Sequence, residues 1–272
     1  MLKTRIVTAV ALLAILLAVL VSGSQLAFVL ALTAFMAAAA WECMRLFGVR
    51  HALGMAGLVT VLFVLVLFNF DGRQMQLLFA LCVALWAIRF APALGLGLPS
   101  SQGLGARLLA MSYALAILGA FAALAVLYRI SGLYLFSVMA LVWVADIGAY
   151  FAGRRFGKNK LAPSISPGKT REGALGGLAC VLLLGFIAHF TPALADTFPA
   201  AVGREWGVPA LIVVLAVVTM ASIVGDLFES MLKRRAGMKD SSNLLPGHGG
   251  VLDRIDALLP VLPLAVLLSA RL

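Results

Sequence analysis

Two groups of polar residues near the end of the chain have a spacing that suits cation binding and phosphate chemistry. Asp226, Ser230 and Lys233 are four and then three residues apart, so on a helix they share one face. Asp253 and Asp256 are three apart and share a face in the same way. Carboxylates packed together without partners repel, and Mg²⁺ takes one or two carboxylates with water and substrate phosphate oxygens. The pattern predicts a magnesium site formed by Asp226, Asp253 and Asp256.

Simpler roles for these acids are open at this point. Asp253 and Asp256 fall at the expected start of a helix, where an acid often caps the helix or interacts favourably with its dipole. Asp226 lies in apolar sequence, and its alternative role is a structural ion pair with Lys233 or Arg234.

Basic residues flank the acids in two segments outside the apolar runs. They are either topology signals and contacts for anionic lipids, or groups that clamp phosphate oxygens beside a metal. Glycines in PGHGG and SPGKTREG would let backbone amides approach a phosphate closely. The GKT string is not a P-loop, because Pro163 stands where that motif has its first glycine and we expect no strand before it. The candidate cations are Lys169, Arg171, Lys233, Arg234, Lys239 and Arg254.

His248 and the cysteines do not indicate a zinc site. His248 lies in PGHGG without a partner His or Cys at zinc-ligand spacing, so it is either a turn residue or a hydrogen-bond donor to phosphate. Cys43, Cys82 and Cys180 are scattered singly in apolar segments, which predicts neither a metal site nor a disulfide framework.

The elements that position these residues are membrane helices. Of the 272 residues 63% are hydrophobic and 12% charged, against about 25% charged in soluble domains. Apolar runs long enough to cross a bilayer recur along the chain, and the alternating strands of a barrel are missing. We predict an all-α polytopic integral membrane protein with nine spans, at Ile6–Val21, Leu26–Trp41, Ala52–Phe68, Met75–Phe90, Leu108–Tyr128, Leu133–Ala152, Gly173–Phe190, Val208–Leu227 and Val251–Ala270.

Charge placement predicts the orientation. With a cytoplasmic N-terminus and a retained first helix, most of the 21 Lys and Arg residues fall on the cytoplasmic side. The net charge of +10 therefore reflects topology and lipid headgroups, and we expect no nucleic-acid partner. Asp146, an acid inside an apolar run and thus a functional candidate, then lies at a depth similar to Asp226. We predict one membrane domain, 1–272, with N-terminal helices in 1–105, catalytic helices in 106–272 and cytoplasmic loops at 153–172 and 233–250.

One long segment carries a family resemblance. SMLKRRAGMKDSSNLLPGHGGVLDRID, residues 230–256, resembles the signature of the phosphatidate cytidylyltransferases, the CDP-diacylglycerol synthases. Asp146, the basic segment SPGKTREG and the hydropathy profile extend the likeness. Every fixed position of the signature is filled: Ser230, Lys233, Arg234, Lys239, Asp240, Pro246, His248, Gly249, Gly250, Asp253, Arg254 and Asp256.

The resemblance implies transfer of a cytidylyl group from CTP to phosphatidic acid, with Mg²⁺, at the cytoplasmic face of a bacterial inner membrane. It implies that Asp226 and Asp253 bind the metal with Asp256 nearby, and that Ser230, Lys233 and Arg234 bind phosphate. It also implies a homodimer, and it leaves open whether a monovalent cation joins the magnesium. The catalytic candidates are Asp226, Lys233, Asp253 and Asp256, and the substrate-binding candidates are Asp146, Lys169, Arg171, Ser230, Arg234, Lys239, His248 and Arg254.

Two other functions compete with this one. An ion-coupled transporter also keeps acids within helices, but it favours acids near the midplane and paired inverted halves, and no such repeat is evident here. A CTP-dependent polyprenol or phytol kinase would use the same nucleotide but release CDP, so its lipid product would contain no cytidine.

Overall fold

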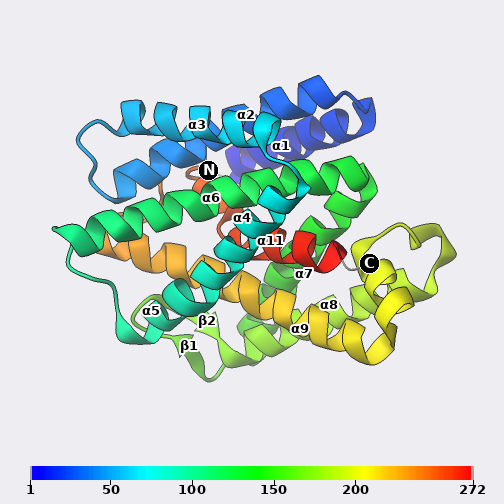
Figure 1. The fold of residues 1–272 in the computed structure, drawn as a ribbon. Coiled ribbons are helices and arrows are strands. Elements are labelled where there is room, and N and C mark those ends of the chain that lie inside the picture. The colour runs from blue at the N-terminus through cyan, green and yellow to red at the C-terminus, as the bar shows by residue number, and fades with distance from the viewer. Residues whose placement is uncertain (1, 271–272) are drawn as a thin grey trace.

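The computed structural model describes residues 2–270 and is a bundle of long helices with one small hairpin (Figure 1). The helices are α1 (Leu2–Ser22), α2 (Gln25–Leu46), α3 (Ala52–Asn69), α4 (Gly72–Leu85), a π-helical turn (Trp86–Phe90), α5 (Ala91–Leu96), α6 (Leu104–Ile130), α7 (Gly132–Phe156), α8 (Arg171–Phe190), a 3₁₀ turn (Pro192–Leu194), α9 (Phe198–Arg235), α10 (Leu252–Ile255) and α11 (Leu258–Ser269). The strands are β1 (Lys160–Ala162) and β2 (Ser166–Thr170).

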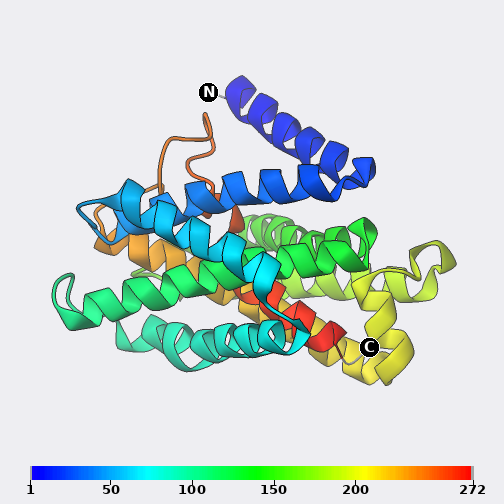
Figure 2. The ribbon, with the colours of Figure 1, turned by 45° about the horizontal axis from the view of Figure 1, so that its top comes forward.

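The helical membrane class is confirmed. Within residues 2–270, seven helices are long and apolar enough to cross a bilayer. They are α2, α3, the continuous stretch Gly72–Leu96, α6, α7, α8 and α9. Nine crossings, a cytoplasmic N-terminus and the division at residue 105 stay predictions. Figure 2 shows α1 at one edge of the bundle, where the Thr8 hydroxyl donates to the Pro246 carbonyl oxygen at 2.8 Å.

The last predicted span, Val251–Ala270, is wrong as a single helix. It consists of the four-residue α10 and the 12-residue α11, with a break at Asp256 and Ala257. Pro260 explains the break, because it has no N–H to donate to the Asp256 carbonyl and its ring would clash there in a continuous helix. The Leu259 N–H instead reaches the Asp256 carbonyl oxygen at 3.4 Å.

α11 forms the centre of the bundle. Leu259, Val261 and Ala265 have no exposed surface, and Figure 1 shows α11 surrounded by longer helices. A broken helix is tolerated at membrane depth where protein covers it, because neighbouring groups can satisfy its freed backbone polar atoms. The break therefore brings Asp256 into the bundle beside α9, where Gly225 leaves room for the Asp256 carbonyl oxygen.

The predicted cytoplasmic loop 153–172 is largely ordered secondary structure. Its first residues complete α7, and β1 and β2 pair antiparallel with Lys160 opposite Thr170. The expectation that no strand precedes GKT is wrong, because β1 does, and Lys169 lies within β2. The Glu172 carboxylate closes the hairpin by accepting hydrogen bonds from Asn159 and from the Lys158 N–H. The hairpin thus holds Lys169 on a rigid support.

α9 is longer than predicted at its C-terminal end. It is kinked at Gly207, where φ is +80°, and Pro209 follows the kink. The predicted span ended at Leu227, but the helix continues to Arg235, so the loop predicted from residue 233 begins at Ala236. This extra length keeps Asp226 and Lys233 on one continuous helix.

Small residues let α7 and α8 pack closely. A Cβ atom on Gly177 would lie 2.6 Å from the Ala145 carbonyl oxygen and 3.3 Å from the Ala149 Cβ. Gly148 is equally crowded, since its Cβ would lie 2.8 Å from the Cys180 sulfur. Close approach through small residues is the usual way membrane helices gain packing energy, because lipid gives no hydrophobic drive for their association.

Gly177→Ala is therefore expected to destabilise the protein by about 1–3 kcal/mol, since the added methyl group forces the two helices apart. The matched control is Gly57→Ala on α3, where a Cβ meets nothing within 4 Å. That change should be neutral or stabilise by up to about 1 kcal/mol through helix propensity. Thermal unfolding of both variants in detergent measures the difference, and equal unfolding temperatures would contradict the packing argument.

Candidate active site

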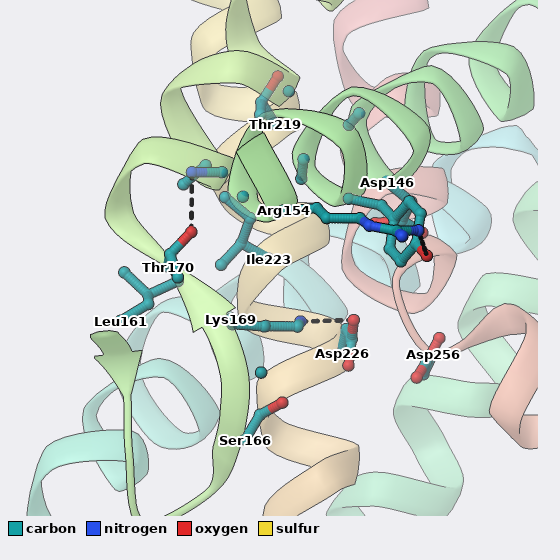
Figure 3. A pocket seen from close by; sticks show the side chains of 18 of the residues that line it. Asp146, Arg154, Leu161, Ser166, Lys169, Thr170, Thr219, Ile223, Asp226 and Asp256 are labelled. Atoms are coloured by element: carbon teal, nitrogen blue, oxygen red, sulfur yellow. Dashed lines mark hydrogen bonds and ion pairs between the residues drawn. The ribbon is translucent and has the colours of Figure 1, made fainter. Parts of the chain in front are cut away.

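A cavity of about 650 Å³ lies between α7, α8, β2, α9 and the residues that precede α11 (Figure 3). Its lining includes small residues such as Ala149, Gly173 and Gly177 together with many charged side chains. Acidic and basic side chains both line it, so the cavity can accept both a cation and an anion. The charged lining residues are Asp146, Arg154, Lys169, Asp226, Lys233, Asp240, Asp253, Arg254 and Asp256.

Asp226 joins the hairpin to α9. Its carboxylate forms an ion pair with Lys169 of β2, as the dashed line in Figure 3 shows. The Ser230 hydroxyl, one turn further along α9, donates to Asp226 Oδ1 at 3.3 Å. Side-chain exposures of 27% for Lys169 and 26% for Asp226 mean that a ligand in the cavity can reach both groups. The predicted helix face of Asp226, Ser230 and Lys233 is present.

Asp253 organises the segment that precedes it. Its Oδ1 accepts from Lys233 Nζ at 2.5 Å, and its Oδ2 accepts from the N–H groups of Ser241 and Gly250 at 2.8 Å each. The Ser241 hydroxyl adds a contact at 2.9 Å. Burial acts to raise the pKa of Asp253, but these hydrogen bonds, that from Lys233 foremost, outweigh it and hold the pKa below its ordinary value. Both carboxylate oxygens are thus already used within the protein.

Lys233 is the cation at the centre of this cluster. Its Nζ lies 2.5 Å from Asp253 Oδ1 and 3.2 Å from Glu229 Oε1, and its side chain is only 12% exposed. Glu229 has no exposed surface, and it was not among the predicted site residues. Its position four residues before Lys233 was the available signal, since helix neighbours at that spacing pair.

Asp256 lies beside Asp226 at the break before α11. Its Oδ1 accepts from the N–H of Ala257 at 2.8 Å. The Asp226 and Asp256 carboxylates line the same cavity, so their negative charges repel each other. Two carboxylates that repel in this way would both be stabilised by a shared cation.

The donor set fits Mg²⁺ bound together with a substrate. Within residues 2–270, no three His, Cys, Asp or Glu side chains form a ready metal cage. Mg²⁺ does not require one, because it usually takes one or two carboxylates and completes its shell with water and phosphate oxygens. Of the three predicted acids, Asp256 accepts only one hydrogen bond from the described residues, and each Asp226 oxygen has one partner among them, Lys169 or Ser230. Asp253 could contribute only by sharing the oxygen that Lys233 now holds.

The structure brings some predicted residues together and separates others. Asp146, Lys169, Lys233 and Arg254 line the cavity with the three acids, and Ser230 joins them through Asp226. The remaining candidates do not line it. Arg234 lines a second, shallower cavity of about 410 Å³ with residues of α5 and the hairpin turn. The others outside the lining are Arg171, Lys239 and His248.

His248 keeps an unexplained feature. Its Nδ1 is buried and has no hydrogen-bond partner among the described residues. The histidine lies in the turn closed by a bridge between Leu245 and Gly249, and its backbone N–H donates to the Leu245 carbonyl oxygen at 2.8 Å. The structure therefore shows His248 as a turn residue, and hydrogen bonding from His248 to a phosphate stays a prediction.

Glu42, on α2, was not among the predicted site residues. This carboxylate has no exposed surface and accepts hydrogen bonds from Ser241, Ser242, Val251 and Leu252. A single acid in the apolar sequence AAAAWECMRL was the signal that could have found it, since buried acids in membrane segments are costly.

These features define a class: a polytopic membrane protein whose cavity, between its helices and the hairpin, combines carboxylates with cationic side chains. The chain matches the cytidylyltransferase family model over residues 3–271, and it belongs to that family. It is 41% identical over 270 residues to the phosphatidate cytidylyltransferase of Pseudomonas aeruginosa, covering 97% of this chain and 95% of that protein. It is 37% identical over 288 residues to that of Haemophilus influenzae, covering 97% and 96%. The resemblance inferred from residues 230–256 is confirmed.

Proposed function

We propose that this chain transfers a cytidylyl group from CTP to phosphatidic acid, forming CDP-diacylglycerol and pyrophosphate in phospholipid biosynthesis. One observation carries the proposal beyond family membership: a single cavity joins Lys169 and Asp226 to Lys233 and Asp253. Each of the two lysines is paired with an acid, Lys169 with Asp226 and Lys233 with Asp253. A nucleoside triphosphate can therefore replace the carboxylates as the partner of the lysines.

The chemistry needs no general base. A phosphate oxygen of phosphatidic acid, already ionised near neutral pH, attacks the α-phosphorus of CTP, and the bond to the β-phosphate oxygen breaks to release pyrophosphate. What remains for the protein is alignment and stabilisation of charge on the phosphoryl oxygens. Lys169 and Lys233 are placed for that role, since both side chains line the cavity from different elements.

The acids of the cavity are the groups that would bind the metal. We infer that Asp226 and Asp256 hold Mg²⁺, with Asp253 as a further ligand when Lys233 turns to a substrate phosphate. Bound magnesium would neutralise negative charge on the triphosphate. Arg254 and Asp146 border the same space, and Ser230 keeps Asp226 oriented.

The setting of the enzyme is part of the proposal. We place it in the bacterial inner membrane with the cavity facing the cytoplasm, where CTP is found, and we expect it to act as a homodimer. The cavity lining combines charged side chains with small residues on membrane helices, which suits a water-soluble and a lipid substrate meeting at one site.

Incorporation of label from CTP into lipid tests the proposal. With purified protein and phosphatidic acid, we expect label from the α-phosphate and cytidine to enter the lipid. EDTA should reduce incorporation to background, and excess Mg²⁺ should restore it, because the metal binds reversibly through carboxylates and substrate.

Two outcomes would contradict this function. Transfer of only the γ-phosphate to a lipid alcohol, with release of CDP, would identify a lipid kinase. No transfer to any lipid, together with ion-dependent transport in vesicles, would identify a transporter.

A further inference from the structure

We infer that Glu42 is a positioning residue for the active site, although it lies on α2 in the N-terminal third of the chain. The inference rests on the proposed function, since it concerns the segment that carries Asp253. Glu42 fixes both ends of the stretch 241–252, and the residues on either side of this stretch, Asp240 and Asp253, line the catalytic cavity.

Four hydrogen bonds connect the Glu42 carboxylate to this stretch. Oε1 accepts from the Ser242 hydroxyl at 2.5 Å and from the Val251 N–H at 3.0 Å. Oε2 accepts from the Ser241 hydroxyl at 3.1 Å and from the Leu252 N–H at 2.6 Å. The donors come from the two ends of the segment, so a single carboxylate closes it into a loop.

The same loop positions the Asp253 carboxylate next to the Lys233 ammonium group. The Ser241 hydroxyl lies within hydrogen-bond distance of both Glu42 Oε2 and Asp253 Oδ2, and the Ser241 N–H also donates to Asp253. Asp253 Oδ1 then accepts from Lys233. A continuous chain of polar contacts therefore runs from α2 to the cation in the cavity.

The space around the carboxylate is fully used. A Cβ atom on Gly250 would collide with both the Ser241 hydroxyl and the Glu42 carboxylate. Gly250 also donates its N–H to Asp253 Oδ2 at 2.8 Å. The absence of a side chain at Gly250 thus lets Glu42 and Asp253 approach the same stretch of backbone from two sides.

A purely structural role explains Glu42 poorly. Burying a carboxylate costs several kcal/mol, and an apolar side chain of similar volume usually packs a helix at least as well. All four donors to Glu42 belong to the stretch 241–252, which Asp253 directly follows. The interaction therefore serves the geometry of that segment rather than the packing of α2 alone.

Glu42→Gln tests the inference, since it keeps the shape but turns one acceptor into a donor that faces backbone N–H groups. We expect kcat/KM for CTP to fall about 10- to 100-fold, equivalent to the loss of hydrogen bonds to a charged group. The fall should be divided between a higher KM for CTP and a lower kcat, because Asp253 and Lys233 lose their alignment. Glu42→Asp, which restores the charge, should recover part of the loss.

An activity-independent measurement accompanies the kinetics. Trypsin should cut after Lys239, which is exposed, faster in Glu42→Gln than in the unmodified protein, because the loop opens locally without global unfolding. The control is Cys43→Ala, which truncates a fully buried neighbour on α2 that makes none of these hydrogen bonds. It should change neither trypsin cleavage nor the KM for CTP.

The outcomes are distinct. Unchanged kinetics and cleavage in Glu42→Gln, or effects equal to those of Cys43→Ala, would overturn the inference. If Glu42→Gln fails to fold, Ser242→Ala removes one donor and should shift KM and cleavage in the same direction to a smaller extent; no shift would overturn it. If the unmodified protein transfers no cytidylyl group, the proposed function fails, while the cleavage comparison still decides the role of Glu42.

Discussion

Asp226→Asn is expected to lower cytidylyl transfer by roughly 100- to 1000-fold or more, while the protein still inserts and folds. The asparagine keeps the size of the side chain and can still accept from Ser230, but it removes the charge that pairs with Lys169 and that would bind Mg²⁺. Because the loss lies in charge stabilisation, raising the CTP concentration should not restore the rate. Label incorporation at saturating CTP, across a range of Mg²⁺ concentrations, measures it.

A matched variant separates this effect from a general loss of negative charge. Asp196→Asn changes an exposed acid in the turn before α9, outside the cavity lining. Its turnover and Mg²⁺ requirement should equal those of the unmodified protein. Near-normal turnover of Asp226→Asn with an unaltered Mg²⁺ requirement would remove Asp226 from the metal site.

Lys233→Met should have the second large effect, and it should reduce both stability and activity. The change leaves Glu229, with no exposed surface, and Asp253, with a 3% exposed side chain, without their shared cation. Removing one partner of a buried ion pair typically costs about 3–5 kcal/mol, because the remaining charge stays desolvated. Denaturant or thermal unfolding in detergent measures the stability, and label incorporation measures the activity.

Two further variants test the cause. Arg155→Gln removes an exposed cation at the end of α7 and should change neither property. The double variant Lys233→Met with Glu229→Gln should regain part of the stability, since one buried charge is neutralised, but none of the activity. If Lys233→Met unfolds at the same temperature as the unmodified protein, the buried cluster does not depend on Lys233.

The C-terminal part of α9 was predictable because its geometry is local. The side chains of Asp226, Ser230 and Lys233 share a face through the repeat of the helix alone, and the structure places them so. The class of the protein followed in the same way, since apolar runs of span length require lipid. Membership of the cytidylyltransferase family was contained in the residues of the signature itself.

The partners of those residues were not predictable in this way. Lys169 reaches Asp226 because a hairpin folds back over α9, and the hairpin depends on pairing between short strands whose signal is weak. Asp256 enters the bundle because Pro260 breaks a run that looked continuous by hydropathy. Hydropathy correctly predicted an apolar, largely helical segment at residues 251–270, but it carried no information about the break between α10 and α11.

The amino-acid sequence by itself determined the membrane class, the family and the shared face of Asp226 and Lys233, because composition, motif identity and helical periodicity are properties of neighbouring residues. Only the tertiary structure decided which acid meets which cation, and it added Glu42 and Glu229 to the site. The reason is physical: a buried carboxylate is tolerated only where donors converge on it. For Glu42 those donors lie about 200 residues away along the chain, at a distance that no local pattern records.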